Sequence, residues 1–238
     1  MIALLTFPAS FGAPSHSPYC VKAMCLLQMS GEAWSPEYLA RPAGMPYGKL
    51  PVIRHDDALL PDSGNLQRFL EARGADFHPG LSTVQKAQAR AFQRLAEENL
   101  GLGLVCERWL NDACWEKVRD VFFADVPEAQ RGAVTDEIRA QVRQGLTGHG
   151  IARMSESDRL ALYDEDLSAI EAMLWEGPFL FGDAPTAADA SVVPFLDMLS
   201  TLPVETALGA KVTGNARLMA YVAAGRGAMY PTKVALAA

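Results

Sequence analysis

The chain has 238 residues, of which 50% are hydrophobic and 21% are charged, as in a soluble globular protein of one large or two small domains. Its net charge of −7 and its scattered basic residues exclude the basic face that nucleic-acid phosphates require. The four cysteines, Cys20, Cys25, Cys106 and Cys114, have neither metal-site spacing nor the density of a disulfide framework. We therefore expect a reducing compartment and no bound metal.

The sequence gives no sign of export or of membrane insertion. A strand pattern begins almost at residue 1, which leaves no room for a secretory leader. The most apolar stretch, near Phe179–Leu202, is interrupted by prolines and aspartates, and no run of eighteen apolar residues occurs. We expect a cytoplasmic protein that does not contact a membrane, with a frayed end at Val234–Ala238.

Residues 1–75 alternate strand and helix patterns. The expected elements, in chain order, are a strand at Ile2–Phe7, a helix from Pro18 to about Met29 ended by Gly31, a strand at Trp34–Ala40, a Pro/Gly-rich loop at 41–48, a hairpin of Leu50–Arg54 with Ala58–Leu60, and a helix from Asp62 or Ser63 to Arg73. This order fits a small mixed sheet with helices packed on it.

From about residue 82 the strand patterns disappear and helix patterns follow one another. The expected helices are 82–110, bent near Gly101 and Gly103, then 113–124, 128–146, 155–174, 187–199 and 213–224. The sequence thus predicts an α/β domain at 1–75 and an all-α domain at 82–238, divided near Gly74–Leu81.

The most informative segment is Ser17-Pro18-Tyr19-Cys20, which opens the first helix. Ser17 suits the N-cap position and Pro18 the first helical position. A side chain there faces free backbone N–H groups and the positive end of the helix dipole, a place suited to holding a thiolate. The pattern is that of a Cys-x-x-Cys motif whose first cysteine is serine. Cys20 is either a reactive thiol with a lowered pKa or a small core residue.

Two further segments of residues 1–75 are candidates for a ligand site. A cis peptide bond before Pro51 would expose the backbone N–H and C=O of Leu50 to a peptide-like ligand. Asp62 and Ser63 open a helix, where Ser63 and backbone N–H groups can hold an α-carboxylate and Asp62 an ammonium group.

Two segments of the helical part have simpler interpretations. Thr186-Ala187-Ala188-Asp189 is a capping box with Asp in place of Glu, which we interpret as structural. Glu107-Arg108-Trp109 is either an internal ion pair beside an aromatic ring or a helix surface.

Together these motifs resemble the glutathione transferase superfamily, and the resemblance covers nearly the whole chain. It rests on Ser17–Cys20, Leu50–Val52, Asp62–Ser63 and Thr186–Asp189, which stand in order at fitting separations. The resemblance implies a thioredoxin-like amino-terminal domain of order βαβαββα, an all-helical carboxy-terminal domain and a homodimer.

A narrower likeness is to the failed-axon-connections and metaxin-like branch of that superfamily. It is carried by Ser17–Lys22, by Glu107–Leu110 and by Gly148–Arg153 with the Met-Ser-Glu that follows. This branch is less well characterised and includes non-catalytic adaptors.

The leading hypothesis is a transferase that binds glutathione as cosubstrate and conjugates it to an apolar electrophile. Ser17 would hydrogen-bond the sulfur as the catalytic group, and the electrophile would lie in a cleft lined by Phe11, Cys106 and Trp109. The residues expected to hold glutathione are Lys49, Leu50, Pro51, Asp62 and Ser63. The alternatives are a non-catalytic adaptor with the same fold and a thiol oxidoreductase that works through Cys20.

Overall fold

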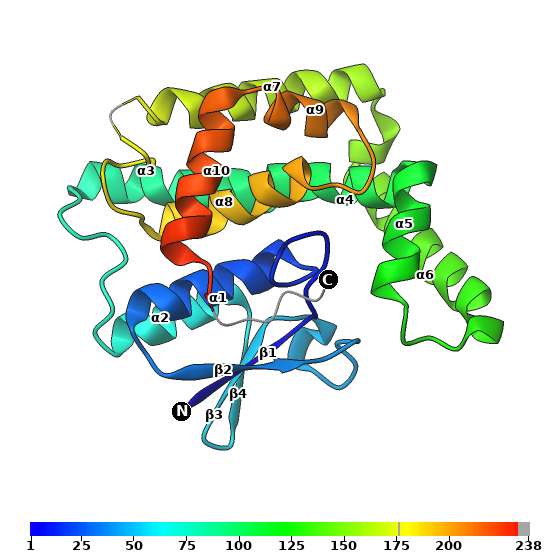
Figure 1. Cartoon of the computed structure of the whole chain (residues 1–238), viewed down its shortest axis with the longest axis horizontal. Coiled ribbons are helices and arrows are strands. Elements are labelled where there is room, and N and C mark those ends of the chain that lie inside the picture. The colour runs from blue at the N-terminus through cyan, green and yellow to red at the C-terminus, as the bar shows by residue number, and fades with distance from the viewer. Residues whose placement is uncertain (176, 233–238) are drawn as a thin grey trace.

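The amino-terminal part of the chain is a mixed four-stranded sheet with two helices packed on one face (Figure 1). In this computed structural model, which describes residues 1–175 and 177–232, the strand order is β2-β1-β3-β4. β1 and β2 are parallel, whereas β1–β3 and β3–β4 are antiparallel. The elements are β1 (Ile2–Thr6), α1 (Pro18–Ser30), β2 (Trp34–Tyr38), the 3₁₀ turn η1 (Pro46–Gly48), β3 (Val52–His55), β4 (Ala58–Pro61) and α2 (Ser63–Ala72).

This arrangement confirms the thioredoxin-like α/β fold class, with one difference in the order βαβαββα. The helix between the second and third strands is only the 3₁₀ turn η1. The loop around it holds two prolines, which lack an N–H donor, and two glycines at positive φ, Gly44 and Gly48. These residues prevent a regular helix from forming there.

The rest of the chain is helical, as expected for the second domain of this fold class. Its elements are α3 (Thr83–Arg94), the π-helical segment η2 (Leu95–Leu100), α4 (Gly101–Leu110), α5 (Asp112–Phe122), α6 (Glu128–His149), the 3₁₀ turn η3 (Ile151–Arg153), α7 (Glu156–Met173), α8 (Ala187–Ser200), α9 (Ala207–Thr213) and α10 (Ala216–Met229). The predicted bend near Gly101 corresponds to η2, where the backbone widens for about one turn before α4 begins.

One predicted helix was wrong in its bounds, and one helix was missed. The helix expected at 213–224 begins instead after Asn215, whose side chain accepts hydrogen bonds from the N–H groups of Arg217 and Leu218. The missed helix is α9, which Thr206 caps. Its seven residues are too few to show a helical period in the sequence.

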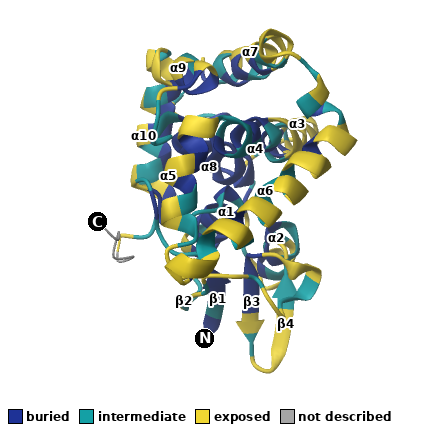
Figure 2. Cartoon of the chain, turned by 90° about the vertical axis from the view of Figure 1, so that its right-hand side faces the viewer, coloured by how far each residue is buried: buried dark blue, intermediate teal, exposed yellow. Residues whose placement is uncertain are grey.

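Helix α8 is the centre of the core (Figure 2). Every residue from Ala187 to Leu199 is buried, because α1, α3, α4 and α10 all pack against this helix. A mostly apolar helix that is buried on all sides requires such an environment. α8 therefore joins the sheet-bearing part and the helical part through one shared core.

None of the helices in residues 1–175 and 177–232 combines the length and the apolar character needed to cross a membrane. The frayed end expected at Val234–Ala238 lies outside the described residues.

Candidate functional site

A cleft of about 750 Å³ lies between the start of α1 and the helices of the second part. Its walls come from the loop before α1, the loop around Arg41, and α4, α5, α6 and α8. Most of the lining is apolar or aromatic, including Phe7, Leu104, Trp109, Phe122, Ile138 and Phe195. Such a cavity suits an apolar small molecule, with orientation set by a few polar groups.

Ser17 lies on the wall of this cleft at the N-terminus of α1. It has extended backbone angles, φ −110° and ψ 127°, and Pro18 occupies the first helical position, as the sequence predicts. The Ser17 side chain, however, makes no capping hydrogen bond. The first-turn N–H groups and the helix dipole therefore face the region of the cleft that Ser17 lines.

Cys20 is fully buried, in a cluster with Leu5, Leu50 and Val52. Burial raises the pKa of its thiol, and the nearby hydroxyls of Thr6, Ser15 and Ser17 only partly oppose this rise. Of the two interpretations of Cys20, the structure therefore favours the small core residue. The alternative, a reactive thiol with a lowered pKa, is wrong.

The Leu50–Pro51 segment has the cis peptide bond that the sequence suggested. Among the described residues, no backbone or side-chain group hydrogen-bonds to the N–H or C=O of Leu50. Lys49 precedes it in an extended conformation and is exposed. These backbone groups are therefore without a hydrogen-bond partner in the described residues.

Asp62 and Ser63 open α2, next to the cis-proline segment. The Asp62 N–H donates to the carbonyl of Pro51 at 3.1 Å, which fixes the two segments side by side. The Asp62 carboxylate caps α2 by accepting from the N–H groups of Gly64 at 2.8 Å and Asn65 at 3.3 Å. Asp62 is exposed, whereas Ser63 is buried, and neither residue is among those that line the cleft.

Of the three residues expected to line the electrophile cleft, the structure places only Trp109 on its wall. Phe11 instead packs beside the cluster around Trp115. Cys106 is buried against Leu146 and Ile151, and this burial raises the pKa of its thiol to about 11. Cys106 lies off the cleft because a helix presents neighbouring residues to different sides. Phe11 lies in the turn between β1 and α1, and its apolar character could not reveal which side of that turn it would occupy.

Two polar residues of the cleft were not recognised as site residues in the sequence. His16 stacks on Phe122, with ring centroids 4.3 Å apart, and burial together with the charge of Arg108 lowers the pKa of His16 to about 4. Arg108 is buried, and its Nη1 donates to the backbone oxygen of His16 at 2.9 Å. The one signal in the sequence was the spacing of Arg108, four residues after Leu104 on the buried face of its helix.

The environment of Arg108 therefore contradicts both interpretations of the segment Glu107–Trp109, the internal ion pair and the helix surface. Within residues 1–175 and 177–232 it forms no ion pair, with Glu107 or with any other carboxylate, and it is not on the surface. Burial lowers the pKa of Arg108 to about 10, so its guanidinium stays protonated at neutral pH.

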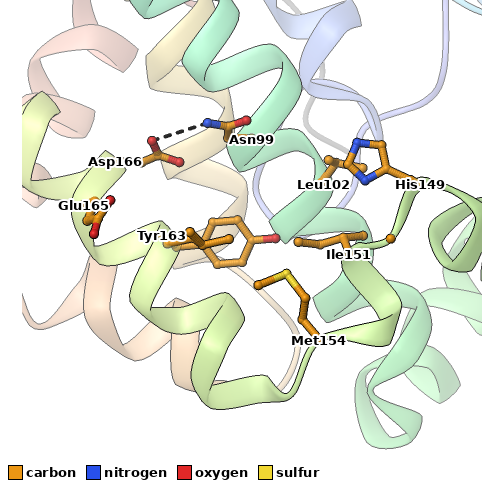
Figure 3. A pocket seen from close by; sticks show the side chains of 10 residues that line it. Asn99, Leu102, His149, Ile151, Met154, Tyr163, Glu165 and Asp166 are labelled. Carbon is orange, nitrogen blue, oxygen red and sulfur yellow. Dashed lines mark hydrogen bonds between the residues drawn. The ribbon is translucent and has the colours of Figure 1, made fainter.

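A second cavity, of about 480 Å³, lies beside the cleft and shares Leu102 and His149 with it (Figure 3). Asn99 donates to Asp166 across its rim at 3.4 Å, and the Tyr163 hydroxyl has no hydrogen-bond partner in the described parts of the chain. No group of three His, Cys, Asp or Glu residues in those parts is arranged to hold a metal ion.

Comparison with known proteins identifies the family. The glutathione S-transferase N-terminal domain matches residues 18–114, and the glutathione S-transferase C-terminal domain matches residues 133–224. The isoprene-epoxide–glutathione S-transferase of Rhodococcus sp. (strain AD45) is 32% identical over 85% of this chain and 88% of its own length. The chain belongs to the glutathione S-transferase family. Metaxin-2 of Homo sapiens is also similar, with 24% identity over 74% of this chain and 68% of its own.

Solved structures, a glutathione transferase among them, share the fold. The β-etherase of Sphingobium sp. strain SYK-6 superposes with a TM-score of 0.64 over 94% of both chains, at 13% identity. A delta-class glutathione transferase of Nilaparvata lugens gives a TM-score of 0.61, covering 98% of this chain and 92% of its own, at 11% identity. In this fold, Ser17 stands directly before α1, and the cleft that it lines is bounded by helices of the second part.

Proposed function

We propose that this protein is a glutathione transferase that lowers the thiol pKa of bound glutathione and conjugates the sulfur to an electrophilic small molecule. The observation that carries the proposal is the position of Ser17. It stands at the N-terminus of α1 and lines a mostly apolar cleft large enough for a small substrate. One end of the site thus stabilises a negative sulfur, while the other holds an apolar molecule.

Glutathione would extend along the sheet-bearing part. The free backbone groups of Leu50 suit pairing with the cysteinyl residue of the tripeptide, as a short added strand held beside Pro51. Asp62 and Ser63, with the first turn of α2, suit the charged γ-glutamyl end, and Lys49 suits a carboxylate. The bond between Asp62 N–H and the Pro51 carbonyl supports this arrangement, because it keeps the two binding segments together.

Activation of the thiol requires only modest stabilisation of its anion. Lowering the pKa by two units corresponds to about 2.7 kcal/mol of preferential thiolate binding. A hydroxyl donor such as Ser17 and the N-terminus of α1 supply stabilisation of this size. Free glutathione is mostly protonated at pH 7, so this shift would greatly increase the reactive fraction.

Epoxides are the first electrophiles to test, because the similar Rhodococcus protein is named for an epoxide of isoprene. An epoxide that carries a small apolar group would fit the aromatic lining around Phe122 and Phe195. The glutathione-dependent loss of such epoxides, followed by chromatography, measures the proposed activity directly.

Ser17→Ala tests the role of the hydroxyl. We expect the pKa of the bound thiol, measured by thiolate absorbance, to rise and turnover to fall about tenfold or more, the effect of losing one charge-assisted hydrogen bond. Ser82→Ala is the matched control, since Ser82 caps α3 with its side chain and does not line the cleft. An unchanged thiol pKa and unchanged turnover in Ser17→Ala would refute this role.

The adaptor alternative draws support from the similarity to metaxins. It predicts no glutathione affinity at millimolar concentration, whereas the transferase predicts a binding heat that disappears in Asp62→Ala. Calorimetric titration separates the two. The oxidoreductase alternative is disfavoured by the burial of Cys20, and deglutathionylation that survives Cys20→Ser would dispose of it.

We also propose a cytoplasmic homodimer, in keeping with the family resemblance. Light scattering after size exclusion measures the oligomeric state, and a monomer at micromolar concentration would contradict the proposed dimer.

A further inference from the structure

Arg108 is a buried cation without a counter-charge among residues 1–175 and 177–232, in a cleft otherwise lined mostly by apolar groups. The residue is 6% exposed and lines the cleft. In the described parts of the chain, Nε has no acceptor, and the hydrogen bond formed by Nη1 goes to a neutral carbonyl. The two carboxylates of the same cleft are already paired, Glu97 with Lys22 and Glu98 with Arg94.

Three of the four other arginines that lie over aromatic rings in the described residues also have a carboxylate partner there. Arg139 lies over Trp115 and pairs with Asp112, and Arg226 lies over Tyr230 and pairs with Asp197. Arg108 lies over Phe122 in the same manner, yet no carboxylate approaches it in the described residues. A buried charge is costly when it is uncompensated, so this one fits a ligand that brings negative charge.

The guanidinium is close to the place where sulfur would react. Its Nη1 holds the backbone oxygen of His16, the residue directly before Ser17. The neutral ring of His16 and the ring of Phe122 lie beside it, and Arg108 is largely shielded from solvent. A donor that is largely shielded from water acts strongly on charge that develops beside it.

We propose that Arg108 is a catalytic residue that stabilises the negative oxygen formed when the electrophile is opened, and that the substrates are therefore oxygen electrophiles such as epoxides. This inference rests on the proposed transferase function. The thiolate sulfur forms a bond to an epoxide carbon, the bond between that carbon and oxygen breaks, and oxygen keeps the electron pair as an alkoxide. Water then protonates the alkoxide, which balances the proton that the thiol released to solvent, and Arg108 stays protonated throughout.

Oxygen electrophiles fit Arg108 better than alkyl halides do. An alkoxide is a compact, strong acceptor for guanidinium N–H groups, whereas a departing halide is large and accepts weakly. A donor that is already in place also costs no reorganisation during the reaction. The contribution of Arg108 to the reaction rate should therefore depend on whether the leaving atom is oxygen or a halogen.

The test compares styrene oxide with benzyl chloride, two electrophiles of similar size, in the full-length wild type, Arg108→Gln and Arg108→Lys. For Arg108→Gln we expect kcat with styrene oxide to fall about 100- to 1,000-fold, the usual effect of losing an oxyanion donor, and kcat with benzyl chloride to fall much less. Arg108→Lys should restore part of the epoxide activity, because it keeps the charge but loses the planar donor set. Glutathione affinity, measured by calorimetry, should stay within about twofold, since binding of the tripeptide does not use Arg108.

Arg139→Gln is the matched control. Arg139 also donates to a backbone carbonyl near the end of α4, at 2.9 Å, and lies over a tryptophan, but it does not line the cleft. We expect its epoxide-to-chloride ratio to equal that of the wild type. Equal losses for both electrophiles in Arg108→Gln, with wild-type activity intact, would overturn the role of Arg108 alone. A wild type that conjugates neither electrophile would overturn both this inference and the proposed function.

Discussion

The ammonium group of Lys22 and the carboxylate of Glu97 form a buried ion pair, with Nζ and Oε1 2.5 Å apart. Lys22 belongs to α1, which packs on the sheet, and Glu97 belongs to η2 in the helical part. Ser191 of α8 donates to the same Oε1 at 3.0 Å, and Tyr19 donates to the Glu97 backbone oxygen at 2.6 Å. Glu97 thus connects the sheet-bearing part and the helical part beside the cleft, through its carboxylate and its backbone oxygen.

Removing one partner of this pair should cost much stability. Lys22→Met leaves the Glu97 carboxylate buried without its counter-charge, and we expect the free energy of unfolding to fall by about 3–5 kcal/mol. Urea denaturation followed by circular dichroism measures the change. The control is Lys211→Met, which breaks the exposed pair with Asp164 and should cost less than about 1 kcal/mol. Equal losses of unfolding free energy in the two variants would show that the buried pair does not stabilise the contact between the two parts.

His16 should make the protein less stable in acid. Its pKa is about 4 in the folded protein, because of burial and then the charge of Arg108, against 6.5 when the chain is unfolded. Between these pH values the unfolded chain binds more protons, so stability is fully present above pH 6.5 and is lost as the pH falls toward 4. This difference corresponds to roughly 3 kcal/mol.

His16→Phe tests this pH dependence. The phenyl ring retains the stacking on Phe7 and Phe122 but cannot take a proton. We expect a shallower dependence of unfolding free energy on pH between 6.5 and 4 than in the wild type. Parallel curves for the two proteins over this window would contradict the lowered pKa of His16.

Local signals in the sequence predicted much of the fold because each element carries its own start and stop. Ser17-Pro18 marked the start of α1, and Gly31, in the left-handed conformation, ends it. α8 begins directly after Thr186 for the same kind of reason, since its capping box lies within four consecutive residues. The sequence also supplied the cis bond before Pro51 as a candidate, although X-Pro bonds are cis in only a few per cent of cases.

The chemistry of the cleft depended on contacts between distant parts of the chain, which no local pattern records. Arg108 was noticed only as a neighbour of Trp109, because its hydrogen bond to His16 spans 92 residues. The pairing of Lys22 with Glu97 spans 75 residues, and a lysine in an apolar helix gives no hint of its partner. Long-range pairing of this kind becomes visible only when the helical part is placed against α1.

Asp189 should contribute more to stability than an ordinary helix cap. It is fully buried and accepts hydrogen bonds from the N–H groups of Leu180 and Thr186, the hydroxyl of Thr186 and the hydroxyl of Tyr221. Asp189→Ala leaves all four donors buried without this acceptor, and we expect a loss of about 3–5 kcal/mol in urea unfolding.

Ser155→Ala is the comparison for Asp189→Ala. It removes an exposed cap from α7 and should cost about 1 kcal/mol. Similar losses in both variants would mean that the buried network adds nothing to the cap.

Gly225 marks the closest approach between α10 and α8. A Cβ atom at this position would lie 2.5 Å from Cγ2 and 2.8 Å from Cγ1 of Val193, a buried β-branched side chain that has little freedom to move. Gly225→Ala should therefore push the two helices apart and lower the free energy of unfolding by about 1–3 kcal/mol. Gly227→Ala, two residues further along α10, meets no atom within 4 Å and should raise stability by up to about 1 kcal/mol, because alanine favours helix more than glycine does.

A double-mutant cycle separates the steric effect at Gly225 from a general effect on α10. In the Val193→Ala background the new methyl group enters space that the valine has left, so Gly225→Ala should cost less than it does in the wild type. Thermal unfolding of the four proteins measures the coupling energy, and Gly227→Ala should show none with Val193→Ala. If Gly225→Ala costs the same with and without the valine, the strain does not arise at this contact, and the packing of α10 on α8 would need another explanation.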